Sequence, residues 1–268
     1  MPTAKNHQLL DIVSHIRMEI FEISHGYLDQ SWHYGDLKAA FTRIYLPLSG
    51  MGRISYGGKT VDLVPGYLYV IPSGLSFSCE CPEALEKIYL HLVLTQPDGR
   101  DLLCGVSDCL VLEDTNRIAQ KLIALESPHG VGSALALNRL IYEVLERALA
   151  LSPIRHAPLP EYSPATKNAL AYIDAHLSAT LSVGEIANAL FLSPAILQKR
   201  FREDVGKPVG QFIDSQLMAK AELLLLANTL SVKEISEKLG FCDQFYFSRR
   251  FSAFHHATPS QFRKMYQA

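Results

Sequence analysis

The chain has 268 residues, of which 48% are hydrophobic and 19% are charged. This composition excludes a disordered chain and provides enough apolar side chains for the cores of two domains. The net charge of −2 argues against nucleic-acid binding by the chain as a whole, but it is unevenly distributed: residues 164–268 carry twelve Lys and Arg and nine Asp and Glu, a net charge of +3, and the remainder carries 13 and 18, a net charge of −5.

The sequence gives no sign of a membrane or a secreted protein. It contains no apolar run of about 18 residues and no basic-then-apolar start, so we expect a cytoplasmic protein without a membrane partner. The five cysteines are an odd number and do not suggest a disulfide framework. Cys79 and Cys81 have no second Cys or His pair at ligand spacing, so no zinc site is predicted.

Short segments rich in β-forming residues alternate with turn signals in the first third of the chain. Gly57 and Gly58 lie between two such segments and predict a tight hairpin. Strands that recur at intervals of about eight to twelve residues are typical of an all-β barrel or sandwich. The predicted strands cover residues 16–23, 40–48, 53–55, 60–62, 67–71, 77–81 and 87–94.

One motif in this region resembles the second sequence motif of the cupin β-barrels: Gly66, Pro72-x-Gly74, Phe77 and Cys81. In metal-binding cupins the last two positions hold His and Asn, and residues 34–90 contain no histidine. The resemblance therefore implies a cupin-like, effector-binding β-barrel over residues 1–112 that has lost its metal site. No metal or other cofactor is predicted, but a barrel mouth is still a suitable pocket for a small ligand.

Aromatic and hydrogen-bonding side chains on or beside these strands are candidates for effector binding. They suit a sugar or an organic acid, and they are equally suited to ordinary barrel core, because alternation along a strand does not say which face points inward. The candidates are Trp32, His33, Arg43, Tyr45, Tyr67, Tyr69, Phe77, Tyr89 and His91.

The hydrophobic period changes at about residue 113. Ile118, Leu122 and Leu125 predict a helix capped by Asp114 or Thr115, and residues 137–148 predict a second, amphipathic helix. This helical pair, residues 113–152, either covers the barrel or forms a dimer seam, and the pattern leaves both interpretations open. Residues 153–163 are rich in proline and predict a linker to a further domain at residues 164–268.

Residues 181–262 contain the same pattern twice. Residues 181–187 (Leu-Ser-Val-Gly-Glu-Ile-Ala) recur at 230–236 (Leu-Ser-Val-Lys-Glu-Ile-Ser), and Gln211-Phe212 recurs as Gln261-Phe262. The offset is 49 residues in the first half and 50 in the second, so one residue is inserted at the second turn. A repeat with matching internal order indicates one supersecondary unit used twice, which we interpret as a helix-turn-helix.

Local signals place the helices of each copy. In the first copy Ser182 and Glu185 predict a capping box, and Ser193-Pro194 predicts the start of the next helix. In the second copy Ser231 and Glu234 predict a capping box, Gly240 the turn and Asp243 the cap of the next helix. Residues 209–227 predict one long helix that separates the two copies.

The outer faces of the second helices carry side chains suited to DNA. A helix presented in this way fits the major groove, where Arg can bond guanine and Gln can bond adenine. The predicted DNA-binding residues are Ala195, Gln198, Lys199 and Arg202 in the first copy, and Gln244, Phe245, Ser248 and Arg249 in the second.

The C-terminal region resembles the DNA-binding domain of the AraC/XylS family of transcription regulators. The resemblance is carried by Gly240-Phe241, residues 246–251 (Tyr-Phe-Ser-Arg-Arg-Phe) and residues 258–263 (Thr-Pro-Ser-Gln-Phe-Arg). Two departures, the small Ala195 and a first turn without glycine, predict that the second copy selects sequence and the first adds affinity.

The resemblance implies an α+β multidomain protein with a cupin-like β-barrel, a helical dimerisation segment and an all-α domain of two helix-turn-helix units. It implies a transcription regulator, not an enzyme, whose partners are double-stranded promoter DNA, a small-molecule effector, a second copy of the chain and RNA polymerase. The alternatives are a cupin-type enzyme fused to a DNA-binding module, and a barrel that binds a partner protein instead of a metabolite.

Overall fold

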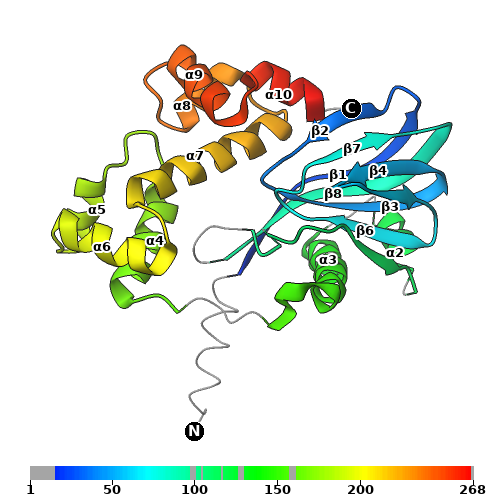
Figure 1. Cartoon of the computed structure of the whole chain (residues 1–268), viewed down its shortest axis with the longest axis horizontal. Coiled ribbons are helices and arrows are strands. Elements are labelled where there is room, and N and C mark those ends of the chain that lie inside the picture. The colour runs from blue at the N-terminus through cyan, green and yellow to red at the C-terminus, as the bar shows by residue number, and fades with distance from the viewer. Residues whose placement is uncertain are drawn as a thin grey trace, which may run out of the picture. The chain divides into compact units, whose positions relative to one another are not determined.

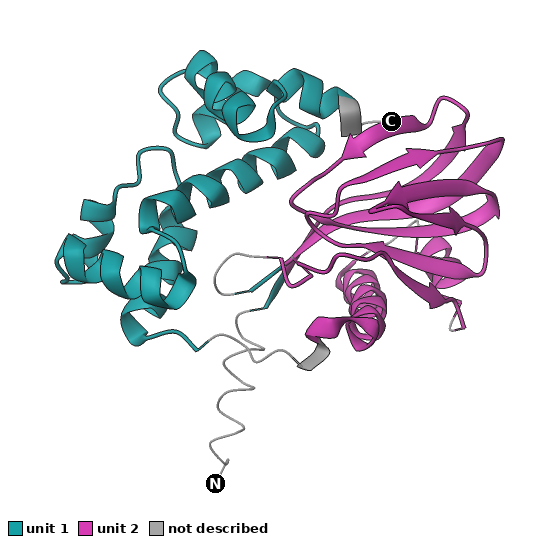
Figure 2. Ribbon diagram, viewed as in Figure 1, with its two compact units in different colours: residues 1–17, 95–100, 158–268 teal, residues 18–94, 101–157 magenta. Residues whose placement is uncertain are grey.

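A computed structural model of the chain describes residues 16–96, 101–103, 105–115, 117–125, 130–156 and 161–266. The chain divides into two compact units (Figure 2). The β-rich unit comprises Met18–Leu94 and Asp101–Ala157, and the helical unit comprises Pro158–Ala268 together with Met1–Arg17 and Thr95–Arg100. The strands thus precede the helices of the C-terminal region, as the α+β class predicts.

The strands of the β-rich unit form two separate sheets. One sheet has the order β1 (Arg17–Asp29), β8 (Ala84–Thr95), β3 (Thr42–Gly50), β6 (Tyr67–Ile71) and β9 (Leu110–Glu113). The other has the order β2 (His33–Leu37), β7 (Phe77–Glu80), β4 (Gly52–Tyr56) and β5 (Lys59–Leu63). Over the described residues the two hydrogen-bond ladders do not join into a closed barrel, so the predicted barrel is observed as a pair of sheets.

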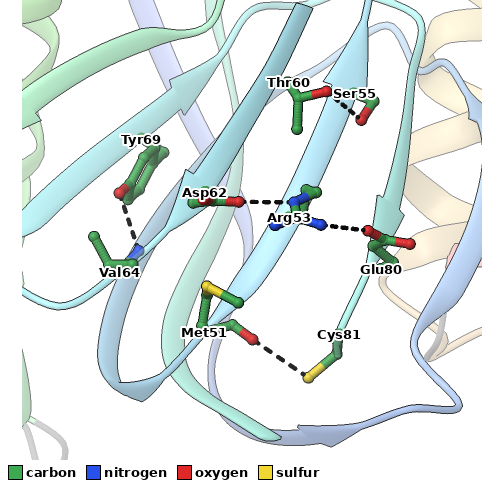
Figure 3. A network of polar contacts seen from close by, with 9 residues as sticks. All are labelled: Met51, Arg53, Ser55, Thr60, Asp62, Val64, Tyr69, Glu80 and Cys81. Carbon is green, nitrogen blue, oxygen red and sulfur yellow. Dashed lines mark hydrogen bonds and ion pairs between the residues drawn. The ribbon is translucent and has the colours of Figure 1, made fainter. Parts of the chain in front are cut away.

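The predicted hairpin joins β4 and β5. Gly57 and Gly58 have φ values of 52° and 78°, as a two-residue hairpin turn requires. On the outer face of this sheet, Arg53 Nε lies 2.7 Å from Asp62 Oδ1 and Arg53 Nη1 lies 3.2 Å from Glu80 Oε1 (Figure 3). These polar cross-strand contacts mark the face that points to solvent, so the alternate residues point toward the other sheet.

The two faces of the five-stranded sheet have different neighbours. Ile44, Leu46 and Leu90 point toward the helices α2 (Ile118–Ile123) and α3 (Val131–Leu151), with which they enclose a gap of only about 10 Å³. Residues of odd number on β3 and β8 therefore point toward the four-stranded sheet. This arrangement settles a point that alternation left open, namely which side of each strand is the interior.

The helices α2 and α3 lie in the predicted region but begin elsewhere: Arg117 is the N-cap of α2 in place of Asp114 or Thr115, and α3 begins at Val131, before the predicted residue 137. Asp114 Oδ1 and Oδ2 accept hydrogen bonds from the N–H groups of Ile118 (2.6 Å) and Ala119 (3.1 Å) at the start of α2. The buried stripe of α3 packs toward the sheet, so this helix covers it; the stripe comprises Leu140, Ile141, Val144, Leu145 and Ala148. A short 3₁₀ helix, η1 (Pro153–His156), occupies the start of the predicted linker.

The helical unit contains α4 (Pro164–His176) followed by the two copies of the repeat. The first copy is α5 (Val183–Ala189) and α6 (Pro194–Val205), the second is α8 (Val232–Lys238) and α9 (Gln244–His255), and α10 (Pro259–Tyr266) follows. The predicted long helix is α7 (Val209–Leu226), which connects the two pairs (Figure 1). No described helix is both long and apolar enough to cross a membrane.

Candidate DNA-binding and effector-binding sites

The second copy places its outer helix with a complete set of caps. Ser231 Oγ accepts from the N–H of Glu234 (3.2 Å), and Glu234 Oε2 accepts from the N–H of Ser231 (2.7 Å), which is the predicted capping box. At the start of α9, Asp243 Oδ1 accepts from the N–H groups of Phe245 and Tyr246, both at 2.7 Å. These bonds fix the direction in which the first turn of α9 points.

The outer face of α9 presents the side chains predicted to contact bases. Phe247 and Phe251 are fully buried on the inner face, which leaves Phe245 70% exposed and Arg249 exposed on the outer face. Gln244 and Ser248 are half-buried. Among the described residues, no acceptor holds the Arg249 guanidinium in a hydrogen bond or ion pair, so it is free to bond a base edge or a phosphate.

The first copy has the same backbone with weaker local support. Ser182 Oγ accepts from the N–H of Glu185 (3.1 Å), but the Glu185 carboxylate accepts from Tyr172 Oη (3.4 Å) and does not complete a capping box. In the turn, Phe191 has φ 55° and is 96% exposed, at the position that Gly240 (φ 74°) occupies in the second copy. A left-handed conformation costs a residue with a Cβ about 1–2 kcal/mol, so the sequence forces strain on the first turn.

One predicted base-contacting residue of the first copy also has a structural role. Gln198 Oε1 accepts from the N–H of Val209 (3.2 Å) at the start of α7, where the N-cap, Pro208, has no side-chain acceptor. In the second copy Thr258 Oγ1 serves the corresponding helix by accepting from the N–H of Gln261 (3.3 Å). The Gln198 carboxamide is therefore held by α7, which limits the orientations in which it can reach DNA.

A surface cleft adjoins the same part of α6. It has a volume of about 420 Å³ and is lined by Gln198, Lys199, Arg202, Glu203 and Pro208. Lys199 and Arg202 are exposed, and among the described residues neither side chain has a hydrogen-bond or ion-pair partner. Two cations beside the N-terminus of α7 suit the DNA backbone better than a base edge.

Lys87 occupies the centre of the space between the two sheets. Its side chain is buried, and its Nζ lies 3.6 Å from the ring centroid of Tyr45, 4.2 Å from that of Trp32 and 5.4 Å from that of Tyr89. Burial, together with the nearby Arg43, lowers the pKa of Lys87 to about 7. Three aromatic faces stabilise the ammonium group but cannot accept its N–H bonds as an oxygen would.

A second polar group lies beside this lysine. His91 Nδ1 is 2.6 Å from Glu22 Oε2, and Tyr89 Oη donates to Glu22 Oε1 (3.0 Å). Burial lowers the pKa of His91 to about 4, so the imidazole is neutral at pH 7. Glu22 and Tyr89 are half-buried, which connects this part of the interior with solvent beside β1.

Comparisons with known proteins bear on both sites. Residues 186–265 match a family model described as a helix-turn-helix domain. The Msm operon regulatory protein of Streptococcus mutans is 24% identical over 254 residues, which cover 89% of this chain and 90% of that protein. The arabinose and xylose operon regulatory proteins of Escherichia coli are 32% and 34% identical, over 48% and 37% of this chain and 44% and 26% of their own lengths.

The chain is therefore similar to an operon regulatory protein over nearly its whole length, and residues 186–265 form a helix-turn-helix domain. It is a DNA-binding protein, and its relatives are regulators and not enzymes. The crystal structure of ToxT from Vibrio cholerae has a TM-score of 0.53 and 13% identity, and the match covers 92% of this chain and 98% of ToxT. This likeness shows that the fold is shared over nearly the whole chain.

Within this fold, six of the nine predicted effector-binding side chains lie in or beside the interior. They are Trp32, Arg43, Tyr45, Phe77, Tyr89 and His91. Tyr69 is buried on the same face as its neighbour Tyr45, and its hydroxyl accepts from the N–H of Val64 (3.0 Å; Figure 3). His33 pairs with Glu80 on the outer face, and Tyr67 is 39% exposed at the end of β6.

Two residues of the interior were not predicted from the sequence, Lys87 and Glu22. Lys87 shares a strand face with Tyr89 and His91, so alternation could have included it once that face was known to be internal. A lysine in a predicted strand is ordinarily expected to point to solvent, so Lys87 was not counted with the interior residues. Among the described residues, no group of three or more His, Cys, Asp or Glu side chains is arranged to hold a metal ion.

Proposed function

We propose that this regulator selects its operator mainly through α9, while α6 adds contacts to the DNA backbone. The observation that carries the proposal is the contrast between two exposed surfaces: Phe245 and Arg249 on α9, against Lys199 and Arg202 beside a cleft on α6. Base contacts confer sequence preference, and phosphate contacts confer affinity without preference.

The experiment compares specific and non-specific binding. An operator is selected from random duplexes with the wild-type protein, and affinities for it and for an unrelated duplex are measured by fluorescence anisotropy at one salt concentration. Arg249→Ala should weaken operator binding by about 1–3 kcal/mol and the unrelated duplex far less, because a bidentate contact to a base is lost.

Lys233→Ala is the control, since Lys233 is exposed on α8 and lies 3.9 Å from Glu237 in an exposed ion pair. It should change neither affinity appreciably. Equal losses on both duplexes for Arg249→Ala would assign Arg249 to the DNA backbone and remove the proposed role of α9.

We infer that a small molecule bound between the sheets of the β-rich unit controls this DNA binding, as the cupin-like effector domain predicts. The interior holds aromatic faces together with a few polar groups, which is the usual composition of a ligand site. The relatives named above are regulators of arabinose and xylose operons, and one ToxT structure holds an aryl-substituted butenoic acid, so sugars and organic acids are the effector classes to test. A ligand would act by shifting a population between two arrangements of the chain.

We also propose that α3 contributes to a homodimer. One side of α3 is buried on the sheet, and Val131 (77%), Leu135 (65%) and Tyr142 (43%) remain exposed on another side. Apolar side chains one and two helical turns apart suit a helix–helix seam. Sedimentation equilibrium should give the mass of two chains for the wild type and of one chain for Leu135→Asp. RNA polymerase is the further partner expected of a promoter-bound regulator.

A further inference from the structure

Lys87 has a buried environment in which a bound anion would stabilise its ammonium group. It is 3% exposed, and among the described residues its Nζ makes no hydrogen bond or ion pair. A lysine that is almost fully buried is ordinarily paired, because burial of an unpaired ammonium is costly. The rings of Trp32 and Tyr45 replace only part of that stabilisation.

The neighbouring carboxylate does not fill this role. Glu22 is engaged by His91 at 2.6 Å and by Tyr89 at 3.0 Å, and no ion pair joins it to Lys87. Arg43 is 2% exposed, and its guanidinium carbon lies 4.3 Å from the ring centroid of Phe41 in the same interior. Two buried basic side chains, Lys87 and Arg43, therefore lie in this interior beside Glu22, whose carboxylate already accepts a hydrogen bond from Tyr89.

We propose that the effector is a small organic acid whose carboxylate accepts hydrogen bonds from Lys87, with its carbon skeleton against the faces of Trp32 and Tyr45. This inference rests on the proposed control by a small molecule and deepens it by naming the ligand class. A carboxylate supplies the acceptor that the ammonium lacks, and a charge-assisted hydrogen bond is strongest in such a dry site. The half-buried Tyr89 and Glu22 mark the side from which the acid enters.

Binding of an acid should be linked to proton uptake. Burial holds the pKa of Lys87 at about 7 in the free protein, and a bound carboxylate raises it, so the amine gains a proton when the acid binds at pH 8. Affinity is then highest below pH 7 and falls as the pH rises above it. The titratable or charged groups around Lys87 are Arg43 and Tyr45 on β3, Tyr89 and His91 on its own strand, Glu22 on β1, Cys79 on β7 and Cys81.

The test uses the full chain and matched pairs of probes. Benzoate, octanoate and galacturonate are compared with benzamide, octanamide and galactose by isothermal titration calorimetry at pH 6.5 and 8.5, without DNA. At least one acid should bind, and it should bind about 10- to 100-fold more tightly than its neutral partner. Its affinity should fall roughly tenfold or more between the two pH values.

Variants at one position assign the effect to Lys87. Lys87→Met keeps the length of the side chain and should remove the preference for the acid, whereas Lys87→Arg should keep the preference and lose the pH dependence, because guanidinium stays charged. Lys121→Met, at an exposed position of α2, should behave as the wild type. If Lys87→Met does not fold, the wild type is compared with Lys87→Arg alone. The proposal then requires that both proteins prefer the acid and that only the wild type loses affinity as the pH rises.

The inference is overturned if no acid of the panel binds, if acid and neutral partner bind equally, or if Lys87→Met folds and still prefers the acid. Its failure is distinguishable from failure of the proposed function, because DNA affinity is measured separately. An acid that binds through Lys87 and leaves DNA affinity unchanged would uphold the site and refute its role in control.

Discussion

The two helix-turn-helix copies have one backbone and different side-chain support, and the difference shows where each copy can specialise. In the second, Gly240 occupies the left-handed turn and Asp243 and a full capping box fix α9. In the first, Phe191 occupies that turn and Gln198 is bound to the start of α7. The polar side chains on the outer helix of the second copy are not needed to hold its fold, so they are available to contact DNA.

The two copies also differ in which of their two left-handed backbone positions is a glycine. The helix that follows the turn ends at Gly206 (φ 79°) in the first copy and at His256 (φ 57°) in the second. Each copy thus has one left-handed position with glycine and one without it. The extra residue of the second copy is located by this comparison at Cys242, which is exposed just before α9.

The largest expected effect comes from exchange of the turn residues. Gly240→Ala should destabilise the helical unit by about 1–2 kcal/mol, because φ is 74° and the new Cβ would lie 3.2 Å from Ser178 Cβ. Phe191→Gly should stabilise it by about 0.5–1 kcal/mol, since strain is relieved and unfolded-state entropy offsets part of the gain. Urea unfolding measures both. Equal and small effects would mean that the two turns are not under different strain.

A smaller effect is expected at the start of α7. Gln198→Ala should cost about 1 kcal/mol of stability, because the buried N–H of Val209 loses its acceptor. Ser248→Ala, at the equivalent position of the second copy, should cost less than about 0.5 kcal/mol. Thermal unfolding of the two variants checks this asymmetry. A larger loss for Ser248→Ala would show that the copies divide their polar side chains differently.

The smallest effect is a difference in acid sensitivity. The N–H of Tyr246 bonds to Asp243 and holds the pKa of that carboxyl below its ordinary value. The stability from this cap is fully present above about pH 4 and is lost as the pH falls through the lowered pKa. The cap of α6, Ser193, does not titrate.

The wild type should therefore lose more stability between pH 5 and pH 3 than Asp243→Ser, which has the first copy's type of cap. Circular dichroism melting curves at the two pH values provide the measurement. Identical losses for both proteins would show that the cap of α9 does not depend on the charge of Asp243.

Much of the helical unit could be predicted from the sequence, because local signals determine its elements. Ser231 with Glu234, Ser193-Pro194 and Asp243 all cap the helices they were expected to cap. The second half of the capping box at Ser182 could not be predicted, since Glu185 is drawn to Tyr172, which lies on another helix. Nor does a sequence pattern show that Phe191 adopts a glycine-like conformation.

The β-rich unit was less predictable because its site depends on contacts between strands far apart in the chain. Alternation placed Tyr45 with Arg43 but could not say that this side faces the second sheet. The helices α2 and α3 decide the matter by covering the opposite face. Lys87 illustrates the limit: only the tertiary structure shows a lysine buried among Trp32, Tyr45 and Tyr89.

Because α7 is unbroken, it fixes both the distance and the rotation between the two helix-turn-helix copies. Its 18 residues correspond to roughly 27 Å of rise, and each residue turns the helix by about 100°. One inserted residue would move the second copy by only about 1.5 Å along the axis but would rotate it by more than a quarter turn. The spacing of the two half-sites in an operator is therefore constrained by the angular position of α9 far more than by the length of α7.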